Sequence, residues 1–433
     1  MESTPLVTQL VTPSRLAKTV LDNGTCIVTE TMEHVRSVAV GVWLDCGSRH
    51  ESPDEGGISH FTEHMVFKGS ENRSAEDIAF AVDGIGGHLD AFTTKESVAF
   101  TATVLDEHLP IAIDVIGDMV LHPVFDAAEL EKEKGVVLEE LKMDEDSPDY
   151  LIHDIFSSSF WSGQALGRPI IGPKSLIEGF SRDGLQQFHQ RVFRPDRLLV
   201  TAAGSLQHDD FVEQVQRQFG GLTGHSQMAV GEPPRATPSI VLHDKPSLEQ
   251  AHICIGVPAH AMAAPERFAG YILSTILGGG VSSRLFLKVR EQAGLAYAVY
   301  SDQSLYDDAG CMTVYAGTSV EATPEVVALV MAEFRDLKRN TVSPAELRRS
   351  KDHLKGSLTL SLESTSSRMS NLARQEKYFR KWISLEEVHE GIEAVTAEEV
   401  QGLANSWFQQ DSIALSVLGS LNGLRIERDD LAC

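Results

Sequence analysis

Strand-like apolar runs alternate along the first half of the chain with longer stretches whose apolar residues have helical spacing. Alternation of apolar and polar residues indicates a strand with one buried face, whereas apolar residues three and four apart indicate an amphipathic helix. The predicted strands are 25–30, 38–48 and 91–104, and the predicted helices are 57–69, 108–122 and 127–145. This order favours an α+β unit in which helices pack on a sheet.

The second half repeats the same order of elements. Its predicted strands are 239–244, 251–258 and 311–320, and its predicted helices are 266–279, 324–338 and 344–364. Between the halves, Gly220–Ser239 is rich in Gly, Pro, Ser and Thr and has no apolar periodicity, which is typical of a linker. We therefore predict two tandem homologous domains, 1–222 and 240–433, joined by a linker at 223–239. Each domain is expected to hold a mostly antiparallel sheet packed with helices.

The late helices of the two halves differ in their carboxylates. When Ala128-Glu129-Leu130 is aligned with Ala345-Glu346-Leu347, Glu133 falls opposite Ser350 and Glu140 falls opposite Ser357. The repeat keeps the apolar pattern but lacks these two acidic side chains, which indicates that folding does not require them. We interpret them as residues that the first half keeps for chemistry.

A metal-binding pattern lies in the predicted helix 57–69. His60 and His64 are four residues apart, so a helix places both imidazoles on one face, and Glu63 lies beside them. Two imidazoles and one carboxylate form a catalytic zinc shell with a position left for water. Glu133 and Glu140 are two helical turns apart, so one can bind the metal while the other supports the site by a hydrogen bond or by charge.

The H-x-x-E-H pattern is that of the inverzincin peptidases. Together with the spacing of these residues, it resembles the pattern of the pitrilysin/insulinase family. The similarity is greatest to its half-length branch, which includes the mitochondrial processing peptidase and small bacterial relatives. The interval from the second His to the third ligand, 140 − 64 = 76 residues, implies Glu140 and not Glu139 as ligand, with Glu133 as the family's additional acidic residue. The resemblance implies one Zn²⁺ per chain, bound by His60, His64 and Glu140, and Glu63 as the catalytic base.

Two further segments carry the resemblance. Gly86–Glu96 is similar to the family's substrate-binding edge strand, with Asp90, Ala91, Phe92 and Thr93 at the binding positions and Asp90 in place of the usual Asn. A Gly-rich loop in the second half precedes Arg290 and Tyr297, which resemble a pair that donates hydrogen bonds to the substrate and the oxyanion. The alternative is that the glycines form a turn and that Tyr297 packs in a core.

The resemblance also implies an assembly and a function. Because double-length members of the family hold two such duplicated halves, this chain is expected to form a clamshell dimer around a chamber, as a homodimer or with a paralogue. Arg290 and Tyr297 are then expected to act across the dimer interface. The expected activity is zinc metalloendopeptidase cleavage of extended or unfolded peptides. Two alternatives are a non-catalytic assembly subunit, which typically loses ligands, and a structural zinc site, which needs four protein ligands.

Composition narrows the partners and the location. A net charge of -25 argues against nucleic acid and allows basic peptide substrates. Five scattered cysteines without a CxxC pair are typical of a reducing compartment, and those in apolar runs are expected to be buried. No uncharged apolar run is long enough for a membrane span. We expect a cytoplasmic protein of bacterial type, or alternatively a protein of an organellar matrix.

Other residues have structural interpretations. Four histidines lie outside any ligand spacing and are expected to be structural or at the surface: His88, His122, His153 and His252. Arg168, in a loop similar to one of the family, is expected either in an internal ion pair or in contact with substrate. The acidic run 144–149 is expected to be a solvated loop that follows the helix 127–145.

Overall fold

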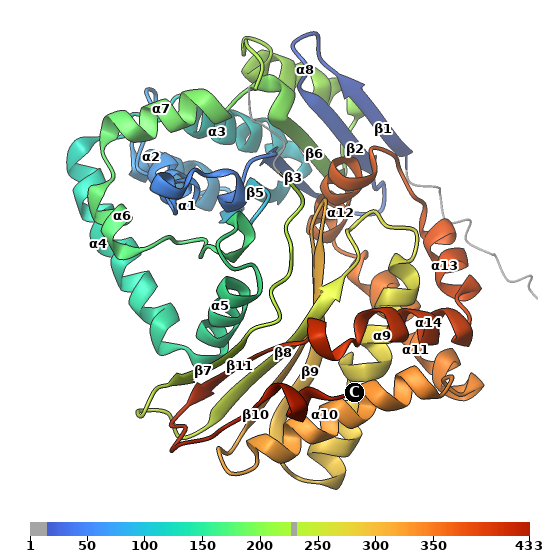
Figure 1. Cartoon of the computed structure of the whole chain (residues 1–433). Helices are drawn as coiled ribbons and strands as arrows, with labels where there is room; N and C mark the ends of the chain where they lie inside the picture. Colours follow the sequence, from blue (N-terminus) through green and yellow to red (C-terminus); the bar gives the residue numbers. More distant parts are fainter. Residues whose placement is uncertain (1–14, 227–231) are drawn as a thin grey trace, which may run out of the picture.

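The computed structural model describes residues 15–226 and 232–433, which contain two sheets with helices on both faces (Figure 1). The first sheet has the order β1-β2-β6-β3-β5-β4, and all neighbouring pairs are antiparallel except β2 and β6. Its strands are β1 Arg15–Val20, β2 Cys26–Thr31, β3 Ser37–Leu44, β4 His88–Thr93, β5 Val98–Leu105 and β6 Leu198–Gly204. The predicted strand 91–104 is therefore the hairpin of β4 and β5.

The second sheet repeats this topology with the order β7-β11-β8-β10-β9, and its one parallel pair is β7 with β11. Its strands are β7 Ile240–Asp244, β8 Ala251–Ala259, β9 Ala296–Leu305, β10 Gly310–Thr318 and β11 Ala414–Gly419. Apart from β1, each strand of the first sheet has a counterpart in the second, so β4 and β9 are equivalent edge strands. The α+β class and the duplicated unit are confirmed.

The helices follow the same duplication, with α1, α3, α4 and α5 of the first half matching α9, α10, α11 and α12 of the second. In the first half they are α1 Ile58–Val66, α2 Ala75–Asp83, α3 Leu109–Leu121, α4 Ala127–Asp146, α5 Pro148–Phe160, α6 Lys174–Gly179, α7 Arg182–Val192 and α8 His208–Phe219. In the second half they are α9 Arg267–Gly278, α10 Thr323–Arg339, α11 Pro344–Ser361, α12 Thr365–Phe379, α13 Leu385–Ala394 and α14 Ala397–Trp407.

The two halves exchange one helix each. Phe156 and Phe160 of α5 pack with buried residues of the second sheet, whereas Met369 and Leu372 of α12 pack on the first sheet. Figure 1 shows α5 beside β7 and β11, and α12 beside β2. Glycines make room on equivalent strands: a Cβ on Gly41 of β3 would lie 2.6 Å from the Met369 sulfur, and one on Gly256 of β8 would lie 2.2 Å from the Phe156 ring. The halves are therefore interlocked beyond the connection between them.

Side chains near β4 also join the halves. Arg49, next to the first sheet, donates to Glu96 at 2.6 Å and to both carboxylate oxygens of Asp308 in the β9–β10 turn at 2.9 Å. Tyr378 at the end of α12 donates to the other oxygen of Glu96 at 2.7 Å. Glu96 is buried, so this network fixes the turn that follows β4 against the second half.

Several predictions can be compared directly with the structure. The prediction that the acidic run 144–149 is a loop is wrong. The helix α4 extends to Asp146 and α5 begins at Pro148, so a single non-helical residue, Ser147, separates the two helices. In the predicted linker, residues 223–226 and 232–239 form neither helix nor strand, while 227–231 lie outside the described residues. Cys26, Cys254 and Cys311 lie in strands; Cys254 and Cys311 are buried, whereas Cys26 is only half-buried.

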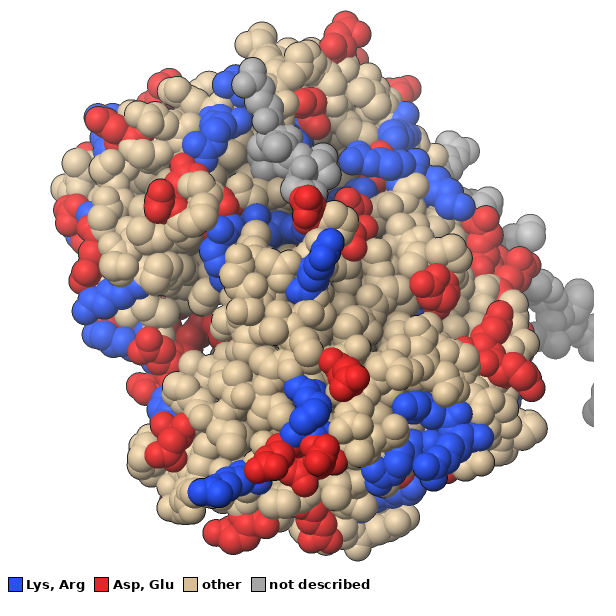
Figure 2. Space-filling view, viewed as in Figure 1, with Lys and Arg blue, Asp and Glu red and all other residues tan. Residues whose placement is uncertain are grey.

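Charge and hydropathy add two observations. On the face seen in Figure 2, acidic and basic side chains are interspersed, with basic side chains gathered toward the lower right. The acidic excess of the chain therefore does not form a single negative field on this face. Among the helices of the described residues, none is long and apolar enough to cross a membrane.

Candidate metal centre

The helix α1, which carries the H-x-x-E-H pattern, is fixed at its N-terminus by a buried carboxylate. Glu51 accepts hydrogen bonds from the backbone N–H groups of Gly57 at 2.9 Å and Ser59 at 2.8 Å. These are N–H groups that the first turn of a helix leaves without an intrahelical partner. Gly57 has a φ of 95°, and a Cβ there would lie 2.1 Å from the Ile171 carbonyl oxygen. Glycine is therefore required where α1 begins.

The two predicted histidines and Glu140 converge between α1 and α4. The Nε2 atoms of His60 and His64 lie 3.6 Å and 3.4 Å from the Glu140 carboxylate oxygens, and ligand atoms of all three residues lie within 4.8 Å of one another. Glu139, the neighbouring carboxylate, pairs instead with Lys142 at 2.6 Å and is exposed. Two imidazole nitrogens and one carboxylate fit a catalytic zinc shell, which leaves a further coordination position.

Glu133, on α4, supports the metal-binding group through a contact with His64. Its Oε1 lies 2.9 Å from Nδ1 of His64, and its Oε2 accepts from Lys68 at 2.6 Å. This contact leaves Nε2 of His64 directed toward Glu140, as an oriented metal-binding imidazole requires. Nδ1 of His60 is buried and has no hydrogen-bond partner among the described residues. The two imidazoles are therefore held differently, one by a carboxylate and one by packing alone.

The protonation of the two imidazoles follows their surroundings. Burial, with a further contribution from the nearby His64, lowers the pKa of His60 to about 4, so this imidazole is neutral near pH 7. Burial alone would also lower the pKa of His64, but hydrogen bonds with Glu133 and Glu140 outweigh it and raise the pKa to about 9. Neutral imidazole is the metal-binding form. His60 is thus in the binding state without any further change.

Glu63 lies on α1 between the two histidines and contacts the edge strand. Thr93, the last residue of β4, donates a hydrogen bond of 2.5 Å to its Oε2. Burial raises the pKa of Glu63, and the bond from Thr93 offsets part of that shift. A carboxylate whose pKa is moved toward neutrality is a better proton acceptor at pH 7. The structure therefore joins the metal helix and the predicted substrate strand through this side chain.

The strand β4 has one free edge. It pairs with β5 alone and ends the sheet order, so its outward N–H and C=O groups have no strand partner in the described residues. Asp90 and Phe92 are exposed, Ala91 and Thr93 half-buried. Asp90 Oδ1 accepts from the N–H of Ala91 at 2.9 Å. The four predicted substrate-binding residues thus lie on an open edge that ends at Glu63.

Arg290 and Tyr297 lie together in the second half. Arg290 is in a π-helix, Phe286–Gln292, and its guanidinium lies over the rings of Phe286 at 4.7 Å and Tyr297 at 5.1 Å. Tyr297, near the start of edge strand β9, is 79% exposed, so it does not pack in a core. No side-chain contact in the described residues joins this pair to His60, His64 or Glu140.

The remaining predicted residues have structural contacts. Arg168 has no ion-pair partner within residues 15–226 and 232–433; it donates to the backbone carbonyl of Glu51 at 2.6 Å, and Lys95 donates to the carbonyl of Arg168. The contact with Glu51 supports the segment before α1 and replaces the expected internal ion pair, whereas the expected contact with substrate stays a prediction. The four histidines that were given structural interpretations lie outside the metal-binding group formed by the described residues.

Sequence reasoning missed two side chains that hold the site. Glu51 is nine residues before His60 in a segment with no helix or strand signal, and nothing in the sequence relates its carboxylate to the α1 N-terminus. Lys68 follows His64 by four residues, so helical spacing could have placed it near the same carboxylate, Glu133. Glu51 could be found only from the packing of α1 on its neighbours, whereas Lys68 left a signal in its spacing.

Comparison with known proteins agrees with this geometry. Residues 26–174 match the model of the insulinase family, peptidase family M16, and residues 179–354 match the model of the M16 inactive domain. The chain is 42% identical over 389 residues to "uncharacterized zinc protease YmxG" of Bacillus subtilis, which covers 90% of this chain and 95% of that protein. It is 39% identical over 393 residues to "uncharacterized zinc protease Rv2782c" of Mycobacterium tuberculosis, with 89% of each chain covered.

Solved structures share the fold at lower identity. A protease from Helicobacter pylori has a TM-score of 0.86 and 20% identity, and the match covers 94% of this chain and 99% of that one. A chain of complex III2 from Candida albicans has a TM-score of 0.84 and 20% identity, with 96% and 100% covered. At this identity the likeness concerns the fold alone.

Proposed function

Since the chain belongs to the insulinase family of peptidases, family M16, we propose that it is a zinc-dependent endopeptidase that cleaves extended or unfolded peptides. The observation that carries the proposal is the convergence of Nε2 of His60, Nε2 of His64 and the Glu140 carboxylate, with Glu63 beside them at the end of an open strand edge. The names of the curated relatives as zinc proteases support it.

His60, His64 and Glu140 would hold one zinc ion per chain. A zinc ion held by these residues would lower the pKa of a water molecule toward ~7 and would polarise the scissile carbonyl. Glu63 accepts the proton of the attacking water on its carboxylate and later delivers it to the leaving amine. Thr93, by donating to Oε2 of Glu63, orients that carboxylate and leaves Oε1 as the proton acceptor. Glu133 keeps His64 in the binding orientation.

The free edge of β4 would bind substrate by strand addition. Backbone groups of Asp90–Thr93 would pair with an extended peptide, which gives affinity with little dependence on substrate side chains. Thr93, the last residue of β4, contacts Glu63. A peptide paired with β4 would therefore lie beside the proton acceptor where the strand ends. Strand addition needs a peptide whose backbone N–H and C=O groups are free along its length, so we propose extended or unfolded substrates, including basic ones.

A second chain would complete the site. The pair Arg290 and Tyr297 has no contact with the metal-binding residues within its own described chain, and Tyr297 is largely exposed. We propose that the pair acts across the interface of a dimer that encloses a chamber, as a homodimer or with a paralogue. There a guanidinium and a phenol would donate to the developing oxyanion. A cytoplasmic location is part of the same proposal, since the curated relatives named above are bacterial.

Zinc content and cleavage of a peptide library, measured on wild type and on Glu63→Gln, test the activity. We expect zinc in both proteins and cleavage by wild type alone, with kcat/KM reduced by about 10²–10⁴-fold in the variant because the proton acceptor is lost. The variant Glu139→Gln is the matched control and should behave as wild type. Zinc without cleavage by wild type would favour a non-catalytic assembly subunit, and absence of zinc would refute the metal site.

Mixing inactive chains tests the dimer. Glu63→Gln lacks the proton acceptor, and Tyr297→Phe lacks the phenol, so each homodimer should be inactive or weakly active. If the pair acts across the interface, a mixture contains dimers with one intact site, and activity should recover toward about a quarter of wild type. No recovery, with native mass spectrometry showing that mixed dimers form, would mean that the pair acts within its own chain.

A further inference from the structure

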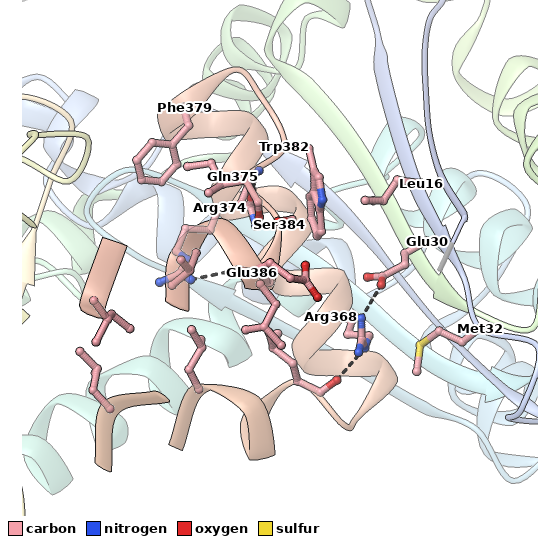
Figure 3. A pocket seen from close by; sticks show the side chains of 18 of the residues that line it. Leu16, Glu30, Met32, Arg368, Arg374, Gln375, Phe379, Trp382, Ser384 and Glu386 are labelled. Atoms are coloured by element: carbon pink, nitrogen blue, oxygen red, sulfur yellow. Dashed lines mark hydrogen bonds and ion pairs between the residues drawn. The ribbon is translucent and has the colours of Figure 1, made fainter. Parts of the chain in front are cut away.

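A cavity of about 1350 Å³ lies between the two halves, apart from the metal-binding group. Its walls come from β1 and β2 of the first half and from α9, α11, α12 and α13 of the second half. In Figure 3, Leu16, Glu30 and Met32 form one side, and Arg374 and Phe379 lie on the opposite side. None of the residues assigned to metal, proton transfer or substrate lines this cavity, so the proposed function leaves it unexplained.

One wall of the cavity is a continuous apolar stripe. Leu354, Leu358 and Leu362 are spaced four residues apart along α11 and its end, so they lie on one face of the helix, and each is only half-buried. Val388 and Ile392, four apart on α13, extend the same surface. Apolar surface of this kind gains free energy when an apolar molecule replaces water. The stripe fits an alkyl chain.

The cavity also holds two arginines without a carboxylate partner. Within the described residues, no Asp or Glu oxygen lies within ion-pair distance of Arg267 or Arg374. Arg374 donates to the Asn371 side chain at 2.9 Å. Arg267 donates from one nitrogen to the Ala264 carbonyl at 3.2 Å and lies over the rings of Phe268 at 4.4 Å and Phe379 at 5.1 Å. A guanidinium stacked on rings keeps N–H groups available for a planar anion.

Three other charged side chains around the cavity bear on its polarity: Arg368 has an ion-pair partner, whereas Glu33 and Glu386 are exposed and have no ion-pair partner in the described residues. Arg368 is paired with buried Glu30 and donates to the Leu362 carbonyl at 2.6 Å (Figure 3). Glu386 is exposed in the first turn of α13, where the helix N-terminus favours a negative charge. Tyr271 lines the cavity from α9, the helix that also carries Arg267; burial raises the pKa of its hydroxyl, and the guanidiniums of Arg374 and Arg267 lower it. The end near the two arginines is therefore the positive end.

We propose that this cavity binds a long-chain fatty acid, with the alkyl chain along the leucine stripe of α11 and the carboxylate at Arg374 and Arg267. The volume exceeds the ~300–1,000 Å³ that a small-molecule site needs, so a long chain is accommodated. Since both halves supply walls, a bound fatty acid contacts both and stabilises their association.

Trp382 lines the cavity and is 37% exposed, which makes it a reporter for the test. A brominated stearate, added below its micelle concentration to the full chain, should quench tryptophan fluorescence, and Trp382→Phe should remove that quenching. Stearate should compete, stearyl alcohol should compete about tenfold less well, and stearate should raise Tm. Arg374→Met should weaken binding by about tenfold or more, whereas Arg339→Met, an exposed arginine at the end of α10, should not change it.

Three results would overturn the proposal. Quenching that persists in Trp382→Phe would place the fatty acid elsewhere. Equal competition by stearate and stearyl alcohol, together with unchanged binding in Arg374→Met, would mean that the arginines hold no carboxylate. Quenching that appears only on dilution, or only in a chain that starts at Arg15, would mean that a second copy or the preceding residues fill the cavity instead.

Discussion

The substitution Glu51→Gln tests whether one buried carboxylate holds the metal helix in place. The two carboxylate oxygens of Glu51 accept hydrogen bonds from the N–H groups of Gly57 and Ser59 at the start of α1. Ser59 immediately precedes the metal-binding residue His60. The glutamine side chain has only one acceptor oxygen. Its NH2 group would face the second backbone N–H, so two donors would meet and that N–H would lose its acceptor. The side chain is nearly the same size, so the change removes hydrogen bonding and charge without opening a cavity.

The expected cost follows from these contacts. A buried N–H group left without an acceptor costs about 1–3 kcal/mol, and the lost charge at the helix N-terminus adds ~0.3–1 kcal/mol. Burial acts in the opposite direction, because it raises the pKa of Glu51 and so penalises the carboxylate that is removed. We therefore expect the free energy of unfolding to fall by about 1–3 kcal/mol. The N-terminus of α1 should also shift, and zinc affinity should fall by about tenfold, because His60 moves with it.

Denaturant unfolding and zinc competition with a chelator measure the two effects separately. Asp54→Asn is the matched control, because Asp54 is exposed in the same segment, and it should leave both quantities unchanged. If Glu51→Gln unfolds at the wild-type free energy and binds zinc as wild type does, the two hydrogen bonds do not fix α1 and this reasoning is wrong. Lower stability with unchanged zinc affinity would mean that Glu51 supports the fold but not the position of His60.

Three further predictions concern other contacts. Glu133→Gln should lower zinc affinity by about 10–100-fold in the same chelator assay, whereas an equal effect from Glu139→Gln would contradict the chosen face of α4. Arg49→Met should lower the free energy of unfolding by about 3 kcal/mol, because it leaves a carboxylate of the network between the halves buried and less paired; an unchanged calorimetric Tm would refute this. Asp118 is buried, but hydrogen bonds from Ser70, Asn72 and Arg73 outweigh burial and lower the pKa of its carboxyl below the ordinary value of 3.8. The stability that this carboxylate contributes is therefore fully present above pH 3.8. It is lost as the pH falls through the lower pKa of the folded state. Asp118→Asn should therefore cost about 2 kcal/mol at pH 7 and little at acidic pH, as followed by urea unfolding across pH.

Local patterns in the sequence indicated the cluster of His60, Glu63 and His64 on one helix and the repetition of an α+β unit. Spacing along one helix places His60, Glu63 and His64 together whatever surrounds them, because the helix period is the same in every protein. The interval to Glu140 that the family resemblance implies selected one of two adjacent carboxylates, and the structure places that one, and not Glu139, beside the imidazoles. Apolar periodicity indicated one set of elements in both halves: β2, β3, β5, β7, β8, β10, α1, α3, α4, α9, α10 and α11. It did not indicate the rest, among them β6, β11 and the exchanged helices α5 and α12.

Tertiary structure alone decided what holds that group and how the halves are joined. The backbone N–H groups of Gly57 and Ser59 donate to Glu51, and Thr93 donates to Glu63; both contacts join segments that carry no mutual signal in the sequence. The exchange of α5 and α12 was hidden for a related reason: an amphipathic helix shows that it has an apolar face, but not which sheet covers that face. Side-chain spacing is a property of one element, whereas these contacts depend on how elements pack, and packing is set by the whole chain.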